Sequence, residues 1–64
     1  MKVKYDKETD ILYIKFSDAQ VSESDEERKG IILDYDAMGN IAGLEIINAS
    51  KNIVQPSKLE YEVA

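Results

Sequence analysis

Alternating apolar and polar positions at the start of the chain predict a β-hairpin. Val3 and Tyr5 alternate with lysines, which is the period-two pattern of a half-buried strand. Residues 6–10 form a polar stretch of hairpin-loop length. Residues 11–16 are rich in β-branched and aromatic side chains, which suit a pleated surface. We therefore expect two antiparallel strands joined by the polar loop.

A second hairpin is predicted for residues 30–36 and 41–47. Gly39 and Asn40 lie between these segments, and both residue types tolerate the positive φ of tight turns. Gly43, inside the later segment, indicates a bulge or a close approach of another group to the backbone.

The rest of the chain carries weaker patterns. Residues 17–29 are the most polar part and predict a mobile connecting loop, with a short helix beginning at Ser22 or Ser24 as the alternative. Ser50 is expected to cap a helical turn that ends before Pro56, and residues 59–63 alternate again as an edge strand. The predicted fold is α+β but mainly β, a four-stranded antiparallel meander of two hairpins with a short C-terminal helical turn and that edge strand.

The same alternation assigns side chains to the two faces of the sheet. One face is expected to form the core, with Leu12, Ile14, Phe16, Ile31, Leu33, Tyr35, Leu44 and Ile46. The opposite face is not cleanly polar, which is unusual for a face in water. It carries a predicted interface of Ile11, Tyr13, Ile32, Ile41 and Ile47. We expect either the C-terminal segment or a second copy of the chain to cover it.

Composition narrows the classes of function. The 64 residues suffice for one domain, residues 1–64, and a chain this short buries only about 60% of its unfolded surface. The absence of cysteine and histidine excludes disulfides, thiolate zinc sites and imidazole-based catalysis, and it fits a cytoplasmic protein. A net charge of −5 argues against nucleic-acid binding, and no apolar run approaches the length of a membrane span. Self-association is the remaining way to stabilise so small a domain.

Carboxylates are the only plentiful reactive groups. Asp34, Asp36, Gly39 and Glu45 match a calcium-loop template, but Met38 stands where an oxygen ligand is needed and strands rather than helices flank the segment. Asp34, Asp36 and Glu45 are therefore a candidate metal site, with ordinary turn-forming aspartates as the simpler interpretation. No oxyanion hole, nucleophile or cofactor motif accompanies them, so no catalytic residue is assigned and an enzyme is not the favoured class.

The two hairpins together resemble a family of short prokaryotic proteins, the domain of unknown function 2283. The resemblance lies in Tyr5-Asp6-Lys7-Glu8-Thr9-Asp10-Ile11-Leu12-Tyr13-Ile14, followed by Asp34, Asp36, Gly39 and the run from Gly43 to Ser50. It implies a β-rich fold with a short C-terminal helical element and no established activity. Members of the family can occur beside genes for toxin-like proteins, so the resemblance favours a partner-binding or antitoxin-like role.

The favoured hypothesis is a small protein–protein interaction module that binds a second copy of itself or a co-encoded protein through an apolar sheet face. The alternative, from a different class, is binding of a divalent cation or a small molecule at the carboxylates of the second hairpin.

Overall fold

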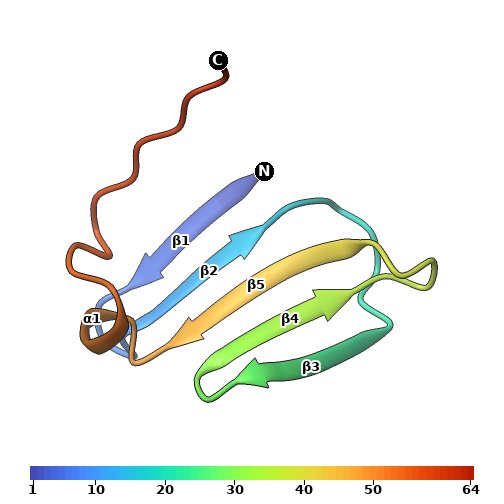
Figure 1. Cartoon of the computed structure of the whole chain (residues 1–64), viewed down its shortest axis with the longest axis horizontal. Helices are drawn as coiled ribbons and strands as arrows, with labels where there is room; N and C mark the ends of the chain where they lie inside the picture. Colours follow the sequence, from blue (N-terminus) through green and yellow to red (C-terminus); the bar gives the residue numbers. More distant parts are fainter.

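A computed structural model describes residues 1–64 and contains one antiparallel sheet and one helical turn (Figure 1). The sheet has five strands in the spatial order β1-β2-β5-β4-β3. The elements are β1 (Lys2–Asp6), β2 (Ile11–Lys15), β3 (Glu23–Arg28), β4 (Ile31–Tyr35), β5 (Ile41–Ile47) and α1 (Ala49–Asn52). The structure contains no helix with the length and apolar character needed to cross a bilayer.

Both predicted hairpins are present, but the predicted meander is wrong. β2 pairs with β5 and not with β4, so that Ile14 lies opposite Leu44. The sheet is therefore a hairpin, β1-β2, placed beside a meander, β3-β4-β5. Local turn residues determine each hairpin, whereas the strand that β2 joins depends on long-range packing that a turn pattern does not encode.

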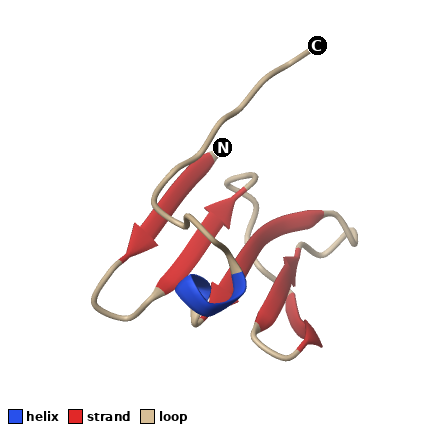
Figure 2. Cartoon of the chain, turned by 60° about the vertical axis from the view of Figure 1, so that its left-hand side comes forward, coloured by secondary structure: helices blue, strands red, loops and turns tan.

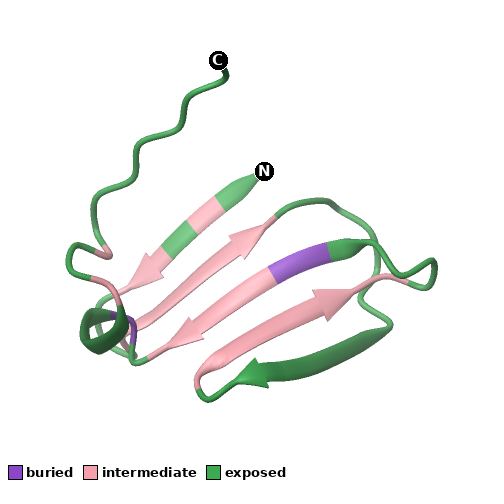
Figure 3. Cartoon of the chain, viewed as in Figure 1, coloured by how far each residue is buried: buried purple, intermediate pink, exposed green.

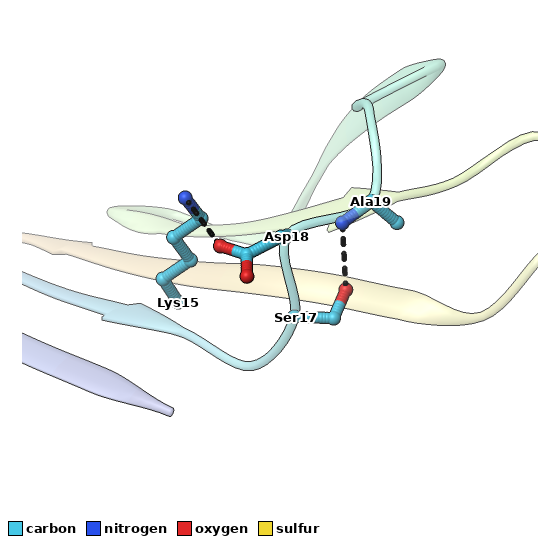
Figure 4. Close-up of polar contacts among 4 residues, drawn as sticks. All are labelled: Lys15, Ser17, Asp18 and Ala19. Carbon is cyan, nitrogen blue, oxygen red and sulfur yellow. Dashed lines mark hydrogen bonds and ion pairs between the residues drawn. The ribbon is translucent and has the colours of Figure 1, made fainter.

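The connection from β2 to β3 crosses the end of the two strands between them. The backbone N–H groups of Phe16 and Ser17 donate to the Ala42 carbonyl at 2.8 and 3.4 Å, and that of Ser22 donates to the Tyr35 carbonyl at 2.8 Å. At its start, Lys15 Nζ lies 3.1 Å from an Asp18 carboxylate oxygen and the Ala19 N–H donates to Ser17 Oγ (Figure 4). This exposed ion pair contributes little to stability, so the backbone bonds hold the crossing.

β3 corrects a second expectation, because residues 23–28 form a strand and not part of a mobile loop. All six side chains are exposed, so the segment has no apolar alternation to reveal it. Backbone pairing with β4 carries the strand, with a bulge between Glu26 and Arg28. Ser24 Oγ donates to the Asp34 carboxylate at 2.6 Å, and the Tyr35 hydroxyl donates to the Glu27 carboxylate at 2.9 Å. A charged edge strand of this kind resists pairing with other chains.

The C-terminal segment contains the expected helical turn but not the expected edge strand. The turn covers Ala49–Asn52 and its N-cap is Asn48, two residues before the predicted cap Ser50, which lies inside the turn. Residues 59–63 form no strand, although they alternate. They make no backbone hydrogen bond with the free edge of β1, and without a paired backbone an alternating segment gains too little to become ordered as a strand.

Left-handed backbone conformations mark each sharp reversal of the chain. Asp10, Gly30 and Gly39 have φ of 56°, 83° and 84° at the ends of the three hairpin loops, and Asn48 has φ of 54° at the entry to α1. Glycine, asparagine and aspartate are the residues that adopt this conformation most readily.

Asp10 also connects the first hairpin to the C-terminal turn. Its carboxylate accepts hydrogen bonds from the Tyr5 hydroxyl at 2.6 Å, the Ser50 hydroxyl at 2.7 Å and the Ser50 N–H at 3.0 Å. Its carbonyl accepts a further bond from the Ala49 N–H at 2.9 Å. We call this group of Tyr5, Asp10, Ala49 and Ser50 the Asp10 latch.

The sheet has no second layer (Figure 2). Only three of the 64 residues are buried: Ala42, Gly43 and Ala49 (Figure 3). None of the eight side chains expected to form the core is buried, and Phe16 is 38% exposed. Six of the eight, Leu12, Ile14, Ile31, Leu33, Leu44 and Ile46, do share one face of the sheet, but no second layer covers that face.

Replacing Asp10 with Asn is expected to lower the thermal unfolding midpoint. An amide oxygen cannot replace a charged carboxylate that accepts three bonds, while asparagine keeps the left-handed backbone. Hydrogen bonds from Tyr5 and then Ser50 lower the pKa of Asp10, and the bond to Asp10 raises the pKa of Tyr5. The Asp10 contribution is therefore present above the ordinary pKa of the group and is lost as pH falls through the lowered one.

Two measurements check this prediction. Melts from neutral to acid pH should show a smaller loss in Asp10→Asn than in the wild type, and titration of the tyrosine absorbance should show the Tyr5 pKa moving down towards its usual value. An unchanged Tyr5 titration in the variant would contradict the latch.

Candidate interaction surface

One face of the sheet presents two apolar rows that run across four adjacent strands. Residues paired directly across an antiparallel sheet share a face. The first row is Val3, Ile14, Leu44 and Leu33, and the second is Tyr5, Leu12, Ile46 and Ile31. We call these eight side chains the apolar face; all are half-buried and none is fully buried.

Charged residues on this side lie at the β3 edge, apart from Asp10, whose carboxylate accepts the Tyr5 hydroxyl at the β1 end of the second row. The first row ends at Asp25 and the second at Arg28. Glu27, whose carboxylate accepts from the Tyr35 hydroxyl, adds a further negative charge at the same edge and raises the pKa of that tyrosine. The apolar face is therefore continuous from β1 to β4 and has an acidic rim along β3.

The C-terminal segment approaches the apolar face only at β1. Leu59 and Tyr61 border an apolar hollow with Met1 and Val3. Leu59 is nevertheless 62% exposed and Tyr61 72% exposed. After α1 the segment runs outside β1 and does not cross the central strands β2, β5 and β4 (Figure 1).

The opposite face mixes apolar and charged side chains. Ile11, Tyr13, Ile32 and Ile47, four of the five residues predicted as an interface, lie there. These side chains alternate with charged ones. One cross-strand row consists of Lys4, Tyr13, Glu45, Ile32 and Glu26. A shallow hollow of about 310 Å³ on this mixed face is lined by Lys4, Asp6, Thr9, Ile11, Tyr13 and Glu45.

Ile41, the fifth predicted interface residue, does not join the other four. A register shift between Asp34 and Tyr35 places Ile41 opposite Tyr35, which follows Leu33 by two residues and so belongs to the side of the apolar face. Ile41 is 49% exposed at the end of β5. The bulge that Gly43 suggested is thus present, and it changes the face on which Ile41 lies.

Gly43 lies beneath a polar pair on the mixed face. A side-chain carbon at this position would stand 2.8 Å from the Tyr13 hydroxyl and 3.1 Å from an Asp34 carboxylate oxygen. The Tyr13 hydroxyl donates to the same Asp34 oxygen at 3.4 Å. Desolvation, followed by the Asp34 charge, raises the pKa of Tyr13. Only glycine leaves room for this contact across three strands.

The three candidate metal ligands are not brought together. Asp34 and Glu45 lie on the mixed face at neighbouring positions, but Asp36 lies in the β4–β5 turn. One Asp36 oxygen accepts the Met38 and Asn40 N–H groups, each at 2.9 Å, and these turn bonds, with that from Asn40 first, lower its pKa. The structure contains no group of three or more acidic side chains placed to hold a metal ion. Asp36 thus acts as a turn residue, which was the simpler interpretation.

The fold and this open surface define a class, that of small single-sheet β-domains with one helical turn. A family model described as protein of unknown function (DUF2283) matches residues 2–50, most of the chain, and the protein belongs to that family. Comparisons with curated proteins and with solved structures find no match.

The residues that carried the family resemblance meet in two places. Tyr5, Asp10, Ala49 and Ser50 form the Asp10 latch. Tyr13, Asp34 and Gly43 form the contact on the mixed face. Both groups join segments distant in sequence, so the pattern describes how the fold is held together. The apolar face, by contrast, is indicated in the sequence only by the alternation of apolar and polar residues. That alternation predicts a buried face but does not identify the segment or chain that covers it.

Replacing Gly43 with Ala is expected to destabilise the protein by about 1–3 kcal/mol, the usual cost of overpacking, because the added carbon meets the Tyr13 hydroxyl. Removing that hydroxyl with Tyr13→Phe should recover most of the loss. Urea denaturation of the two single variants and the double variant gives the coupling energy. Equal effects of Gly43→Ala in the two backgrounds would show that Tyr13 does not explain the glycine.

Proposed function

We propose that this chain is a protein–protein interaction module whose sheet binds another polypeptide through the apolar face. The observation that supports it is the pair of apolar rows, four strands wide, with no covering layer. Stable domains bury such a face against a second layer of secondary structure. A contiguous exposed apolar patch with a charged rim is the usual mark of an interaction site.

The energetics favour binding by this face over the mixed face. Each 100 Å² of apolar surface removed from water contributes about 2.5 kcal/mol. On the mixed face, part of that gain is offset because Lys4 and Glu45 lose hydration unless a partner pairs with them. The apolar face has its charges only at the rim, where they keep contact with water.

An antitoxin-like role, in which the face caps a co-encoded protein, is one form of this function and rests on the family resemblance. The cytoplasm is the compartment we propose, from the cysteine-free composition.

A matched pair of substitutions on one strand tests the proposal. Leu33→Lys places a charge on the apolar face, and Ile32→Lys places the same charge one residue away on the mixed face, between Glu26 and Glu45. Immobilised wild type and Ile32→Lys should retain the same partner from native lysate, and Leu33→Lys should lose at least about tenfold in affinity for that partner once it is purified and titrated by calorimetry.

Circular dichroism of both variants controls for folding. A partner that binds Leu33→Lys as tightly as the wild type, or that is lost only with Ile32→Lys, would contradict the proposal.

A further inference from the structure

We propose that the occupant of the apolar face is a second copy of this chain, and that the two sheets pack face to face with β3 of each copy over β1 of the other. This inference rests on the proposed function and names its partner. It follows from the amount of surface left exposed, from the place of β5 in the sheet and from the distribution of charge at the two edges.

The exposed area is too large for a finished monomer. A folded monomer of 7.2 kDa is expected to expose about 4,100 Å². This chain exposes 5196 Å², an excess of about 1,100 Å². Standard stable interfaces bury about 800 Å² on each partner. The excess, part of which belongs to the extended C-terminal segment, thus has the size that one such interface removes.

The shape of the chain suits a two-layer dimer. It measures 33 × 31 × 19 Å, so it is broad and thin. Face-to-face sheets pack about 10 Å apart with their strands within about 30° of one another. A second copy would supply the missing layer, and the half-buried side chains of both copies would become the core of a β-sandwich.

With the strands of the two sheets aligned, a two-fold axis can be placed in two ways, and the strand order distinguishes them. β5 is the central strand, with β1 at one edge and β3 at the other (Figure 1). A two-fold axis parallel to β5 lays β5 on β5, β2 on β4 and β3 on β1. An axis across the strands instead lays β3 on β3 and β1 on β1. In both cases the contact is isologous and closed, so it does not lead to fibres.

Charge favours the axis parallel to β5. β3 has the sequence ESDEER, with four acidic side chains and one basic, whereas β1 has the sequence KVKYD, with two basic and one acidic. Stacking β3 on β3 would bring like charges together within the screening length of about 8–10 Å. Stacking β3 on β1 avoids this repulsion, because β1 presents Val3 and Tyr5 on the apolar side. Lys2 and Lys4 start from the mixed face, and their long side chains can extend round the sheet edge towards the acidic strand.

Sedimentation across a dilution series provides the first test. The wild type and Ile32→Lys are expected to sediment as dimers. Leu33→Lys should weaken dimerisation by at least about a hundredfold, because a two-fold interface contains each substitution twice. The wild-type dissociation constant should also rise with salt concentration, because salt screens the edge charges.

Cross-linking tests the arrangement, since the chain has no cysteine of its own. Val3 and Asp25 lie at opposite ends of one cross-strand row of the apolar face. A mixture of Val3→Cys chains and Asp25→Cys chains should form a covalent dimer with a short bis-maleimide, and Asp25→Cys chains alone should not. Efficient cross-linking of Asp25→Cys to itself would overturn the proposed arrangement.

A monomeric wild type would overturn the dimer, and a soluble paramagnetic agent then separates the two proposals. If it relaxes the methyl groups of Leu33, Leu44 and Ile46, the face is open and the interaction module stands without the dimer. If those methyl groups are protected in the monomer, the chain covers its own face and both proposals fail. A dimer abolished by Ile32→Lys and retained by Leu33→Lys would place the interface on the mixed face and also refute the inference.

Discussion

The pairing of β2 with β5 is the interaction on which the rest of this structure depends. It joins two units that are otherwise local, the β1-β2 hairpin and the β3-β4-β5 meander, through five residue pairs. The apolar rows become continuous across four strands only because Leu12 and Ile14 are brought opposite Ile46 and Leu44. The same pairing places the start of α1 beside the first hairpin, where Asp10 receives Ser50. A long-range contact of this kind must overcome loop-closure entropy, and the Asp10 latch and the backbone bonds at Ala42 reinforce it from either end.

A sheet one layer thick is a poor way for a monomer to exclude water. Within a single sheet, each side chain is covered only by the side chains of adjacent strands. Full burial requires a second layer packed on that face. Here the only buried residues are two alanines and a glycine. Each of them is small and lies where backbone segments meet. The large aliphatic side chains remain half-buried, so part of the favourable free energy of their burial is still to be gained. Binding is the process in which such a molecule gains it, and this links the architecture directly to the function that we propose.

The two faces carry out different tasks. The mixed face contains the contact of Tyr13 and Asp34 above Gly43, which fixes three strands at one close approach. Its charges alternate with isoleucines, so it remains in water at little cost. The apolar face makes one polar contact within the chain, from the Tyr5 hydroxyl to the Asp10 carboxylate at its β1 end, and its other charges lie on β3. The acidic β3 therefore has two effects. It protects one sheet edge from unwanted strand pairing, and it makes that edge of the apolar face negative while the β1 edge is not.

Sequence alone determined the local part of this fold. Alternation placed β1, β2, β4 and β5, glycine and asparagine marked the tight turn between the last two, and Gly43 indicated the bulge. β3 was not predicted, because an edge strand of six exposed polar residues has no hydrophobic periodicity. The tertiary structure decided which strand β2 joins, that Asp36 closes a turn and is not part of a ligand cluster, and that Ile41 leaves the mixed face at a register shift. It also left the expected core as an open surface. An alternating pattern predicts that one face of a strand is buried, but it does not predict whether the same chain or another chain covers that face.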